Sequence, residues 1–493
     1  MPLILALDQS TSATKALLFE TDGRVVDRES RDHAQHYPRP GWVEHDAEEI
    51  WQNTLAAAGQ VLGRQQSRQG EIAAVSLTNQ RETIVVFDRS TGRPLHPAIV
   101  WQCRRGDEVC REYLAAGREE LIHEKTGLKI DAYFSASKLQ WLVRNNPVIR
   151  ARLRDGSALI GTIDAYLIYR LTEGRVFATD TTNASRTLLF DIKRLAWDEE
   201  LCAVWDVQMA ALPEVRAASA RFGSTDFAGQ LSVPLPICGV IGDSQASLFA
   251  HRCFSAGDVK VTFGTGSSLL VNIGPAPRFS PKGVLTAIAW THGETTTYAM
   301  EGIVIASAST LTWLRDQLGL ARDVPEIEQL ALQVPDSAGV HLVPAFTGLG
   351  LPYWNAEARA AITGLTPLTD RRHIARAGFE SIALQIGEAL AAIQAEVGTT
   401  IETLHGDGGP TASRFLMQLT ADLTGAPLRA SQNPNFSPLG AAWLGALGIG
   451  AVKAPADLLA MPRDEGRFTP SADAVWRAAR FAAWRRAVRQ TCA

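Results

Sequence analysis

Short apolar runs alternate with polar turns in the first half of the chain. These runs predict strands over residues 3–7, 15–19, 72–77 and 83–87, with another strand from Arg24. Asp46 and Glu49 have the spacing of a capping box, which predicts a helix that ends near Arg64. Apolar residues at helical spacing predict further helices over residues 136–143 and 161–169. The first half is therefore expected to be α/β.

The pattern partly repeats after residue 250. Strands are predicted over residues 258–263 and 269–273, and helices over residues 303–318, 376–397 and 411–423. Leu404 to Pro410 is expected to be a glycine loop, and Ser437 an N-cap with Pro438 at the first helical position. A chain of 493 residues is too long for one core. We therefore predict two domains, residues 1–250 and 251–493.

The segment Ile237 to Phe249 joins an apolar run to a helix through a Gly-Asp-Ser turn. An acid at the end of a strand, just before a helix, is a common way to hold a carboxylate at the floor of an active site. Asp243 is therefore a candidate general base. The alternative is that Asp243 only caps the following helix.

Each half carries a strand–turn–strand hairpin whose turn is rich in Ser, Thr and Gly. The turns are Asp8 to Thr14 and Gly264 to Ser268, and the chain also has a Gly408-Gly409 pair before a predicted helix. Such turns suit phosphate oxygens, because backbone N–H groups and hydroxyls converge on one point. Two ordinary β-hairpins are the alternative. Because the chain has two such turns and a Gly-Gly loop, the sequence favours a nucleotide cleft between two domains.

Composition and missing motifs exclude several classes. The chain has 48 basic and 52 acidic residues, which argues against a nucleic-acid surface. None of the six cysteines forms a CxxC or has zinc-ligand spacing with histidine, as expected for reduced thiols of a cytoplasmic protein. The apolar run 439–452 is too short to span a membrane. There is no Gly-Lys pair, so no P-loop, and Gly264-Thr265-Gly266 lacks the third glycine of a dinucleotide site.

Longer motifs carry a resemblance over nearly the whole chain. Tyr133 to Leu142 and most of Gly364 to Glu380 fit two signatures of the FGGY family of carbohydrate kinases, with Gly378 as a departure, and Asn79 to Thr83 and Val343 to Trp354 are similar to its glycerol kinases. The resemblance implies an actin/hexokinase-type, ribonuclease H-like ATPase with a central nucleotide cleft. It implies transfer of phosphate from ATP, with Mg²⁺, to a primary hydroxyl of a polyol or sugar, above all glycerol. It also implies a homodimer or another homo-oligomer, with no nucleic-acid or membrane partner.

The resemblance assigns roles residue by residue. Asp243 would be the base and a metal contact, and Asp8 would orient Mg²⁺. The polyol contacts would be Arg81, Glu82, Trp101, Tyr133, Asp243, Ser244 and Ser268. The ATP contacts would be Thr11, Ser12, Lys15, Gly264, Thr265, Gly266, Ala308, Gly408 and Gly409.

Three departures from the glycerol-kinase pattern leave the substrate open. Ser244 stands where a glutamine is usual, Ser268 where a phenylalanine packs on glycerol, and Arg414 where an asparagine lies near adenine. The two serines are expected to enlarge the substrate site. The alternatives are therefore a kinase for a longer polyol or ketose, of the erythritol, xylitol or xylulose type, and, more remotely, an actin- or chaperone-like ATPase that acts by binding a partner.

Overall fold

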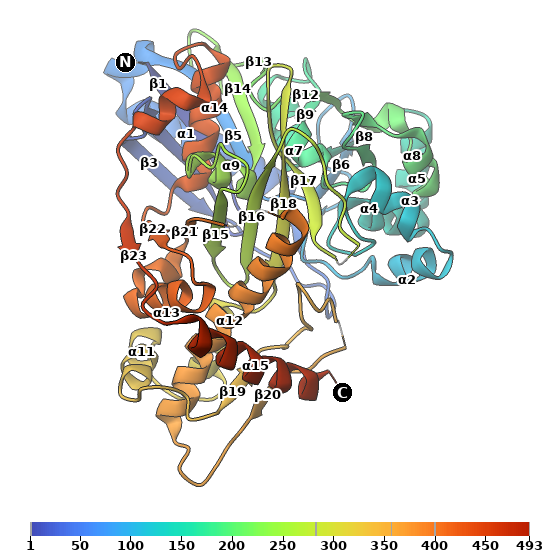
Figure 1. Ribbon diagram of the computed structural model, residues 1–493. Helices are drawn as coiled ribbons and strands as arrows, with labels where there is room; N and C mark the ends of the chain where they lie inside the picture. The colour runs from blue at the N-terminus through green and yellow to red at the C-terminus, as the bar shows by residue number, and fades with distance from the viewer. Residues whose placement is uncertain (1, 282, 356, 399–400, 493) are drawn as a thin grey trace.

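Two large sheets form the centre of the molecule. The computed structural model describes residues 2–281, 283–355, 357–398 and 401–492. One sheet belongs to the first half of the chain and lies at the top of Figure 1, and the other runs across the middle of the molecule, from β17 and β18 near the centre to β22 and β23 at the left. Both sheets begin with an antiparallel hairpin and continue with parallel strands, so the repetition predicted from the sequence is confirmed.

The first sheet has the order β13-β14-β5-β1-β2-β3. Its strands are β1 (Leu3–Gln9), β2 (Ala13–Glu20), β3 (Val25–Asp32), β5 (Ile72–Asn79), β13 (Arg221–Thr225) and β14 (Leu235–Gly242). Every residue of β1 is buried, because helices cover both faces of this part of the sheet. Strands β1, β5 and β14 run parallel, so Asp8, Asn79 and Gly242 come together at the carboxyl ends of these strands, which form one edge of the sheet.

Helices from both halves of the chain pack on this sheet. They are α1 (Ala47–Arg64), α6 (Ile163–Leu171), α9 (Asp243–Ala250) and α14 (Phe436–Gly448). Helix α14 belongs to the last part of the sequence but contacts β14, β5 and β1. Its glycines permit this contact, since a Cβ on Gly445 would lie 2.1 Å from the Ser76 hydroxyl on β5 and 2.8 Å from the carbonyl oxygen of Cys238 on β14.

The second sheet has the order β17-β18-β16-β15-β21-β22-β23. Its strands are β15 (Val259–Phe263), β16 (Ser267–Gly274), β17 (Leu285–His292), β18 (Thr295–Val304), β21 (Leu404–Asp407), β22 (Leu428–Ala430) and β23 (Gly466–Phe468). The helices below it are α10 (Ala308–Asp316), α11 (Val324–Leu332), α12 (Arg371–Val397), α13 (Arg414–Thr424) and α15 (Ala474–Thr491). The strand pair β19 (His341–Val343) and β20 (Ala361–Thr363) lies beside them.

The part of the chain between β5 and β14 forms a third region of smaller elements, at the right of Figure 1. Its sheet has the order β4-β7-β6-β8, with β4 (Glu44–His45), β6 (Ile84–Asp88), β7 (Ala98–Ile99) and β8 (Ala158–Thr162). The helices are α2 (Asp107–Ala115), α3 (Glu119–Thr126), α4 (Ser135–Asn145), α5 (Pro147–Arg154), α7 (Thr181–Ala184) and α8 (Glu199–Val204), and the short strands are β9 (Ala178–Asp180), β10 (Phe190–Asp191), β11 (Ala196–Trp197) and β12 (Glu214–Arg216).

Several predicted boundaries are wrong, two of them because strand pairing decides them. Ile303 and Val304 end strand β18, where they pair with Ser268 and Ser267, and the helix begins only at Ala308. Leu404 to Asp407 is a strand and not a loop, since β15 and β22 pair with it on either side. The N-cap of α14 is Asn435, so Ser437 lies inside the helix.

The capping box at α1 is only half formed. Asp46 is the N-cap and accepts hydrogen bonds from the backbone of Glu48 and Glu49. The Glu49 side chain accepts instead from the backbone N–H of Ala34, at 3.4 Å. A contact from a distant segment has therefore replaced the local one.

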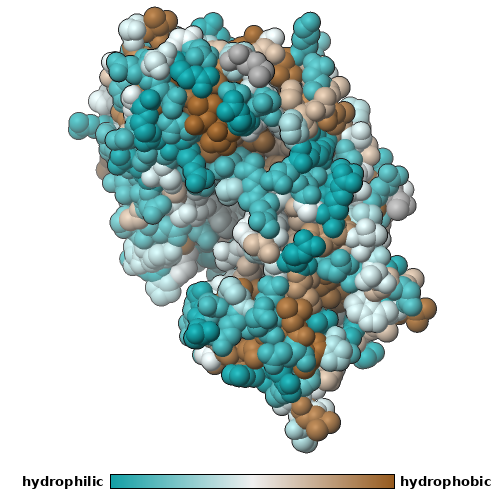
Figure 2. All heavy atoms as spheres, turned by 90° about the vertical axis from the view of Figure 1, so that its left-hand side faces the viewer, coloured by the Kyte–Doolittle hydropathy of each residue, from teal (hydrophilic) through white to brown (hydrophobic). Residues whose placement is uncertain are grey.

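The surface is hollowed half-way down, between the lobe of the first sheet above and the lobe of α11 to α13 below (Figure 2). The edge of the first sheet that carries Asp8 and Gly242 faces the second half of the chain, as shown by the bond from Ser437 to the carbonyl oxygen of Asp243. Among the helices of the described residues, none combines the length and apolar character that crossing a membrane requires.

Candidate active site

Asp243 is the first residue of α9, directly after strand β14. The N-cap is Gly242, so the interpretation of Asp243 as a mere N-cap is wrong. Its carboxylate accepts a hydrogen bond from the backbone N–H of Ser244 at 2.6 Å, and its side chain is 38% exposed. A carboxylate with this access can meet a ligand, while its own backbone is held by the Ser437 hydroxyl at 3.0 Å.

Arg81 connects Asp243 to a buried group of charges. Its Nε lies 3.3 Å from Asp243 Oδ1, and its two terminal nitrogens donate to Gln245 and Glu301 at 3.2 and 2.9 Å. The side chain is only 5% exposed. Since two acceptors on α9 and one on β18 hold the guanidinium, its position against Asp243 is well defined.

A second arginine completes this group. Arg186 donates to Glu82 at 2.6 Å and pairs with Glu301 at 2.5 Å. All of these side chains are nearly inaccessible to solvent. Burial opposes ionisation of Glu301, but Arg186 and Arg81 outweigh it and lower its pKa to about 2. We name Arg81, Glu82, Arg186 and Glu301 the charged floor of the site.

Glu82 adopts a left-handed backbone conformation, with φ of 61°. Such a conformation is costly for a residue with a Cβ and is kept only where the surroundings impose it. Here the Glu82 carbonyl accepts from Ser135 at 3.0 Å, and its side chain reaches Arg186. The turn therefore aims Arg81 and Glu82 into the same region of the molecule.

Asp8 lies at the end of β1 and faces the same region. Lys15 Nζ is 3.5 Å from its carboxylate. Burial raises the pKa of Asp8, Lys15 opposes the shift, and the charge of Asp243 adds to it. Two carboxylates that repel each other in a site with one lysine suit a bound hard cation, because oxygen is the donor that Mg²⁺ prefers. The residues present therefore fit this ion.

Trp101, a predicted polyol contact, is hydrogen-bonded to the turn Asp8 to Thr14. Trp101 Nε1 donates to Thr11 Oγ1 at 3.0 Å, and the Trp101 ring packs edge-on against Tyr133, with centroids 5.4 Å apart. Burial raises the pKa of Tyr133. Lys138 donates to the backbone carbonyls of Ala132, Tyr133 and Phe134, which fixes the loop that carries Tyr133.

The two serines that depart from the family pattern differ in position. Ser244 is half-buried in the first turn of α9. Ser268 lies on β16, and its Oγ is buried and has no hydrogen-bond partner among the described residues. Ile303 pairs with Ser268 across the strands and packs against the cluster that also contacts Trp101 and Tyr133. The hydroxyl of Ser268 thus lines no open space, and an apolar side chain stands next to it.

The second phosphate turn partly satisfies itself. Gly264 N–H donates to Gly266 at 2.9 Å, and the N–H of Ala308 donates to Gly264 at 3.0 Å. One N–H group of the turn, that of Gly264, is therefore used inside the protein, and so is that of Ala308, which lies outside the turn. Thr265 is exposed, as is Ser12 in the first turn. The exposed residues Thr265 and Ser12 are therefore accessible to a phosphate group.

Gly408 and Gly409 follow strand β21, and their backbones differ. Gly408 has φ of 98°, and a Cβ there would lie 1.9 Å from the carbonyl oxygen of Phe263. Gly409 is exposed, with nothing near its virtual Cβ. Arg414 begins α13, is exposed, and lies over the ring of Phe468 at 5.4 Å. A nucleotide could approach Gly409 closely, because no side chain covers it.

Residues 3–250 match the N-terminal domain of the FGGY family of carbohydrate kinases, and residues 259–449 match its C-terminal domain. The chain belongs to this family. The resemblance stated from the sequence is confirmed. The division between residues 250 and 251 stays a prediction, and helix α14 packs across it.

Relatives and solved structures agree with the family. This FGGY kinase is 46% identical over 485 residues to a glycerol kinase of Symbiobacterium thermophilum, covering 98% of this chain and 97% of the relative. It superposes on the crystal structure of Plasmodium falciparum glycerol kinase with ADP with a TM-score of 0.94, at 35% identity, covering 100% of this chain and 98% of the other. The ligand-bound xylulose kinase of Lactobacillus acidophilus shares the fold, with a TM-score of 0.88 at 21% identity, covering 100% and 97%.

The actin/hexokinase-type fold is therefore confirmed, and so is the class of reaction. The protein is a phosphotransferase that acts on an alcohol group, and its family implies ATP as the donor. The structure brings Asp243, Arg81 and Asp8 to one place, and Trp101, Tyr133 and Thr11 to an adjoining one.

Sequence reasoning missed Glu301, Arg186 and Gln245, which hold the predicted residues. Nothing in the sequence around Arg186 indicates an ion pair. Glu301 lies just before a segment that was expected to be helical. Only the pairing of β16 with β18 shows that its side chain reaches Arg81.

Proposed function

We propose that this FGGY kinase transfers the γ-phosphoryl group of ATP to a primary hydroxyl of glycerol. The observation that supports this most strongly is Asp243: a solvent-accessible carboxylate that adjoins a buried arginine and a buried second carboxylate. The names of the relatives point to the same substrate.

In the proposed reaction, Asp243 accepts the proton of the primary hydroxyl as its oxygen attacks the phosphorus in line with the leaving group. Arg81 orients the carboxylate and donates to a neighbouring hydroxyl of the substrate. Glu301, which also pairs with Arg186, holds Arg81 in place throughout the reaction. Bound Mg²⁺, held by Asp8 together with Asp243, would neutralise charge on the phosphates.

Ile303 supports a small substrate. A glycerol-sized site needs an apolar wall opposite Trp101, and Ser268 removes the ring expected there. Side chains that face each other across an antiparallel pair have Cβ atoms about 5 Å apart, so Ile303 stands beside the position of the missing ring. Since the Ser268 hydroxyl is buried, the substitution leaves no open space at that atom.

The test is the rate of ADP release with ATP, Mg²⁺ and one of four acceptors: glycerol, erythritol, xylitol or xylulose. We expect the highest kcat/KM with glycerol. A higher value with a longer polyol or with xylulose would overturn the assignment and favour an enlarged pocket.

A pair of variants tests the wall. Ile303→Ala should raise the KM for glycerol about tenfold, equivalent to ~1.4 kcal/mol of lost apolar contact. Ile305→Ala is the matched control, because Ile305 is 37% exposed and should leave the KM unchanged. Equal effects of the two substitutions would show that Ile303 does not line the substrate site.

A further inference from the structure

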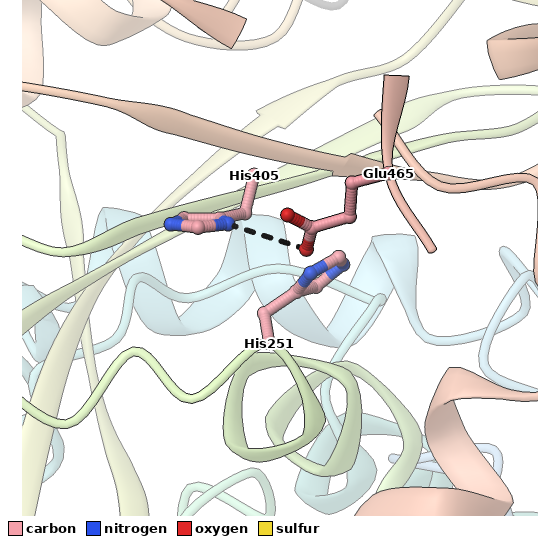
Figure 3. Close-up of side chains that lie close together, drawn as sticks. All are labelled: His251, His405 and Glu465. Carbon is pink, nitrogen blue, oxygen red and sulfur yellow. Dashed lines mark ion pairs between the residues drawn. The ribbon is translucent and has the colours of Figure 1, made fainter. Parts of the chain in front are cut away.

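Two histidines and a glutamate converge beside strand β21. His251 is the C-cap of helix α9, His405 lies on β21, and Glu465 immediately precedes β23 (Figure 3). One ligand atom from each lies within 4.8 Å of the others, and His405 Nδ1 is 3.9 Å from Glu465 Oε1. The residues are far apart in the sequence, so the spacing of cysteines and histidines along the chain could not indicate the cluster.

His251 is oriented as a metal-binding histidine would be. Its Nε2 lies 3.1 Å from Asp407 Oδ2, and its ring stacks on Phe436 with centroids 4.0 Å apart. Since Nε2 carries the proton that Asp407 accepts, Nδ1 keeps a free lone pair. That nitrogen is buried and has no partner among the described residues, and the side chain is aimed into the cluster. A carboxylate on the second nitrogen is the usual companion of a metal-bound histidine.

One basic side chain occupies the mouth of the cluster. Arg463 lies 3.4 Å from both His405 Nδ1 and Glu465 Oε1. Its side chain is 23% exposed, and no other acidic side chain among the described residues forms an ion pair with it. It can therefore turn toward solvent when a divalent ion takes its place against Glu465.

We propose that His251 Nδ1, His405 and Glu465 bind a divalent first-row transition metal ion, with Zn²⁺ as the best fit. Two imidazoles and one carboxylate are a common set of protein ligands for zinc, with a fourth position left for water. Bonds of about 2.1 Å require the three atoms to draw together by roughly 1 Å. The ion would join α9, β21 and the segment before β23, next to Asp407 and thus below the Gly408-Gly409 loop.

This site differs in chemistry from that of Asp8 and Asp243. The latter offers only carboxylate oxygen and suits Mg²⁺, whereas imidazole nitrogen selects transition metals. Binding is therefore measured without nucleotide, on chelator-treated full-length protein. Zn²⁺ is titrated against a chromophoric competing chelator, and Co²⁺ is used as a spectroscopic substitute.

We expect the protein to bind one equivalent of Zn²⁺ tightly. Bound Co²⁺ should show the visible absorption band of a four-coordinate ion. His405→Ala and Glu465→Gln should each weaken binding at least tenfold. Arg463→Ala should bind Zn²⁺ at least as tightly as the natural protein, since it removes a positive charge beside the ion. His36→Ala, which removes an exposed imidazole elsewhere, is the control and should change nothing.

Circular dichroism of each variant verifies that it is folded. The proposal is overturned if the natural protein binds no stoichiometric Zn²⁺, or if His405→Ala and Glu465→Gln bind it as well as the natural protein does. It is also overturned if Arg463→Ala weakens binding as much as they do, because the cluster would then depend on the arginine and not on the ion.

Discussion

Glu301→Gln tests the charged floor. Glu301 is fully buried, and its two oxygens pair with Arg81 at 2.9 Å and Arg186 at 2.5 Å. The substitution keeps the shape of the side chain but leaves two buried guanidiniums with one buried carboxylate, that of Glu82, while Asp243, the other partner of Arg81, is 38% exposed. Removing one partner of a buried ion pair costs about 3–5 kcal/mol, because an uncompensated charge stays behind. We expect a loss of unfolding free energy of that size.

The same substitution should also change catalysis. Without Glu301, Arg81 has fewer acceptors, and its pairing with Asp243 across 3.3 Å becomes stronger. A carboxylate that a cation holds more tightly takes up the hydroxyl proton of the substrate less readily, so kcat should fall by about tenfold or less. The KM for ATP should not change, since the charged floor makes no contact with the phosphate turns in the described residues.

The assays are urea unfolding followed by circular dichroism and steady-state kinetics by ADP release. Glu112→Gln is the matched control: Glu112 pairs with Arg144 at 2.6 Å, but both side chains are at least 40% exposed. An exposed pair contributes about 0–1 kcal/mol. The reasoning is refuted if Glu301→Gln lowers the unfolding free energy no more than Glu112→Gln does and leaves kcat unchanged. Burial would then not strengthen the ion pairs of the charged floor.

Four other substitutions test the proposed base, the glycine loop and the buried His45. Asp243→Asn should lower kcat at least ~10²-fold while nucleotide binding persists, and near-normal turnover would exclude Asp243 as the base. Gly408→Ala should cost about 1–3 kcal/mol of stability because its Cβ meets Phe263, whereas Gly409→Ala should raise only the KM for ATP; equal stability of both variants would contradict the steric argument. Burial lowers the pKa of His45 to about 3, so below pH 6.5 the unfolded chain takes up a proton that the folded protein does not, and stability falls as the pH drops. His45→Gln should reduce this loss by up to about 1.4 kcal/mol per pH unit between pH 6 and 4, as measured by urea unfolding, and an unchanged pH dependence would refute the assignment.

Local patterns determined much of this protein. The apolar runs of β1, β2 and β5 and the spacing along α4 and α12 follow from side chains only a few residues apart. The position of Asp243 between β14 and α9 is equally local, since a strand that ends in Gly-Asp-Ser must turn there. The hairpins could be predicted for the same reason.

Only the tertiary structure decided which groups stand against these residues. Arg81 meets Glu301 across 220 positions of sequence, and His251 meets Asp407 across 156. Strand β21 also depends on such contacts, because its glycine and polar residues, followed by Gly408-Gly409, predict a loop, whereas in the structure β15 and β22 supply hydrogen bonds on both sides. The energy of a buried charge or of a strand without its own periodic pattern comes from partners that are distant along the chain. A single sequence carries no local trace of those partners, so the charged floor and the histidine cluster emerge only when the chain is folded.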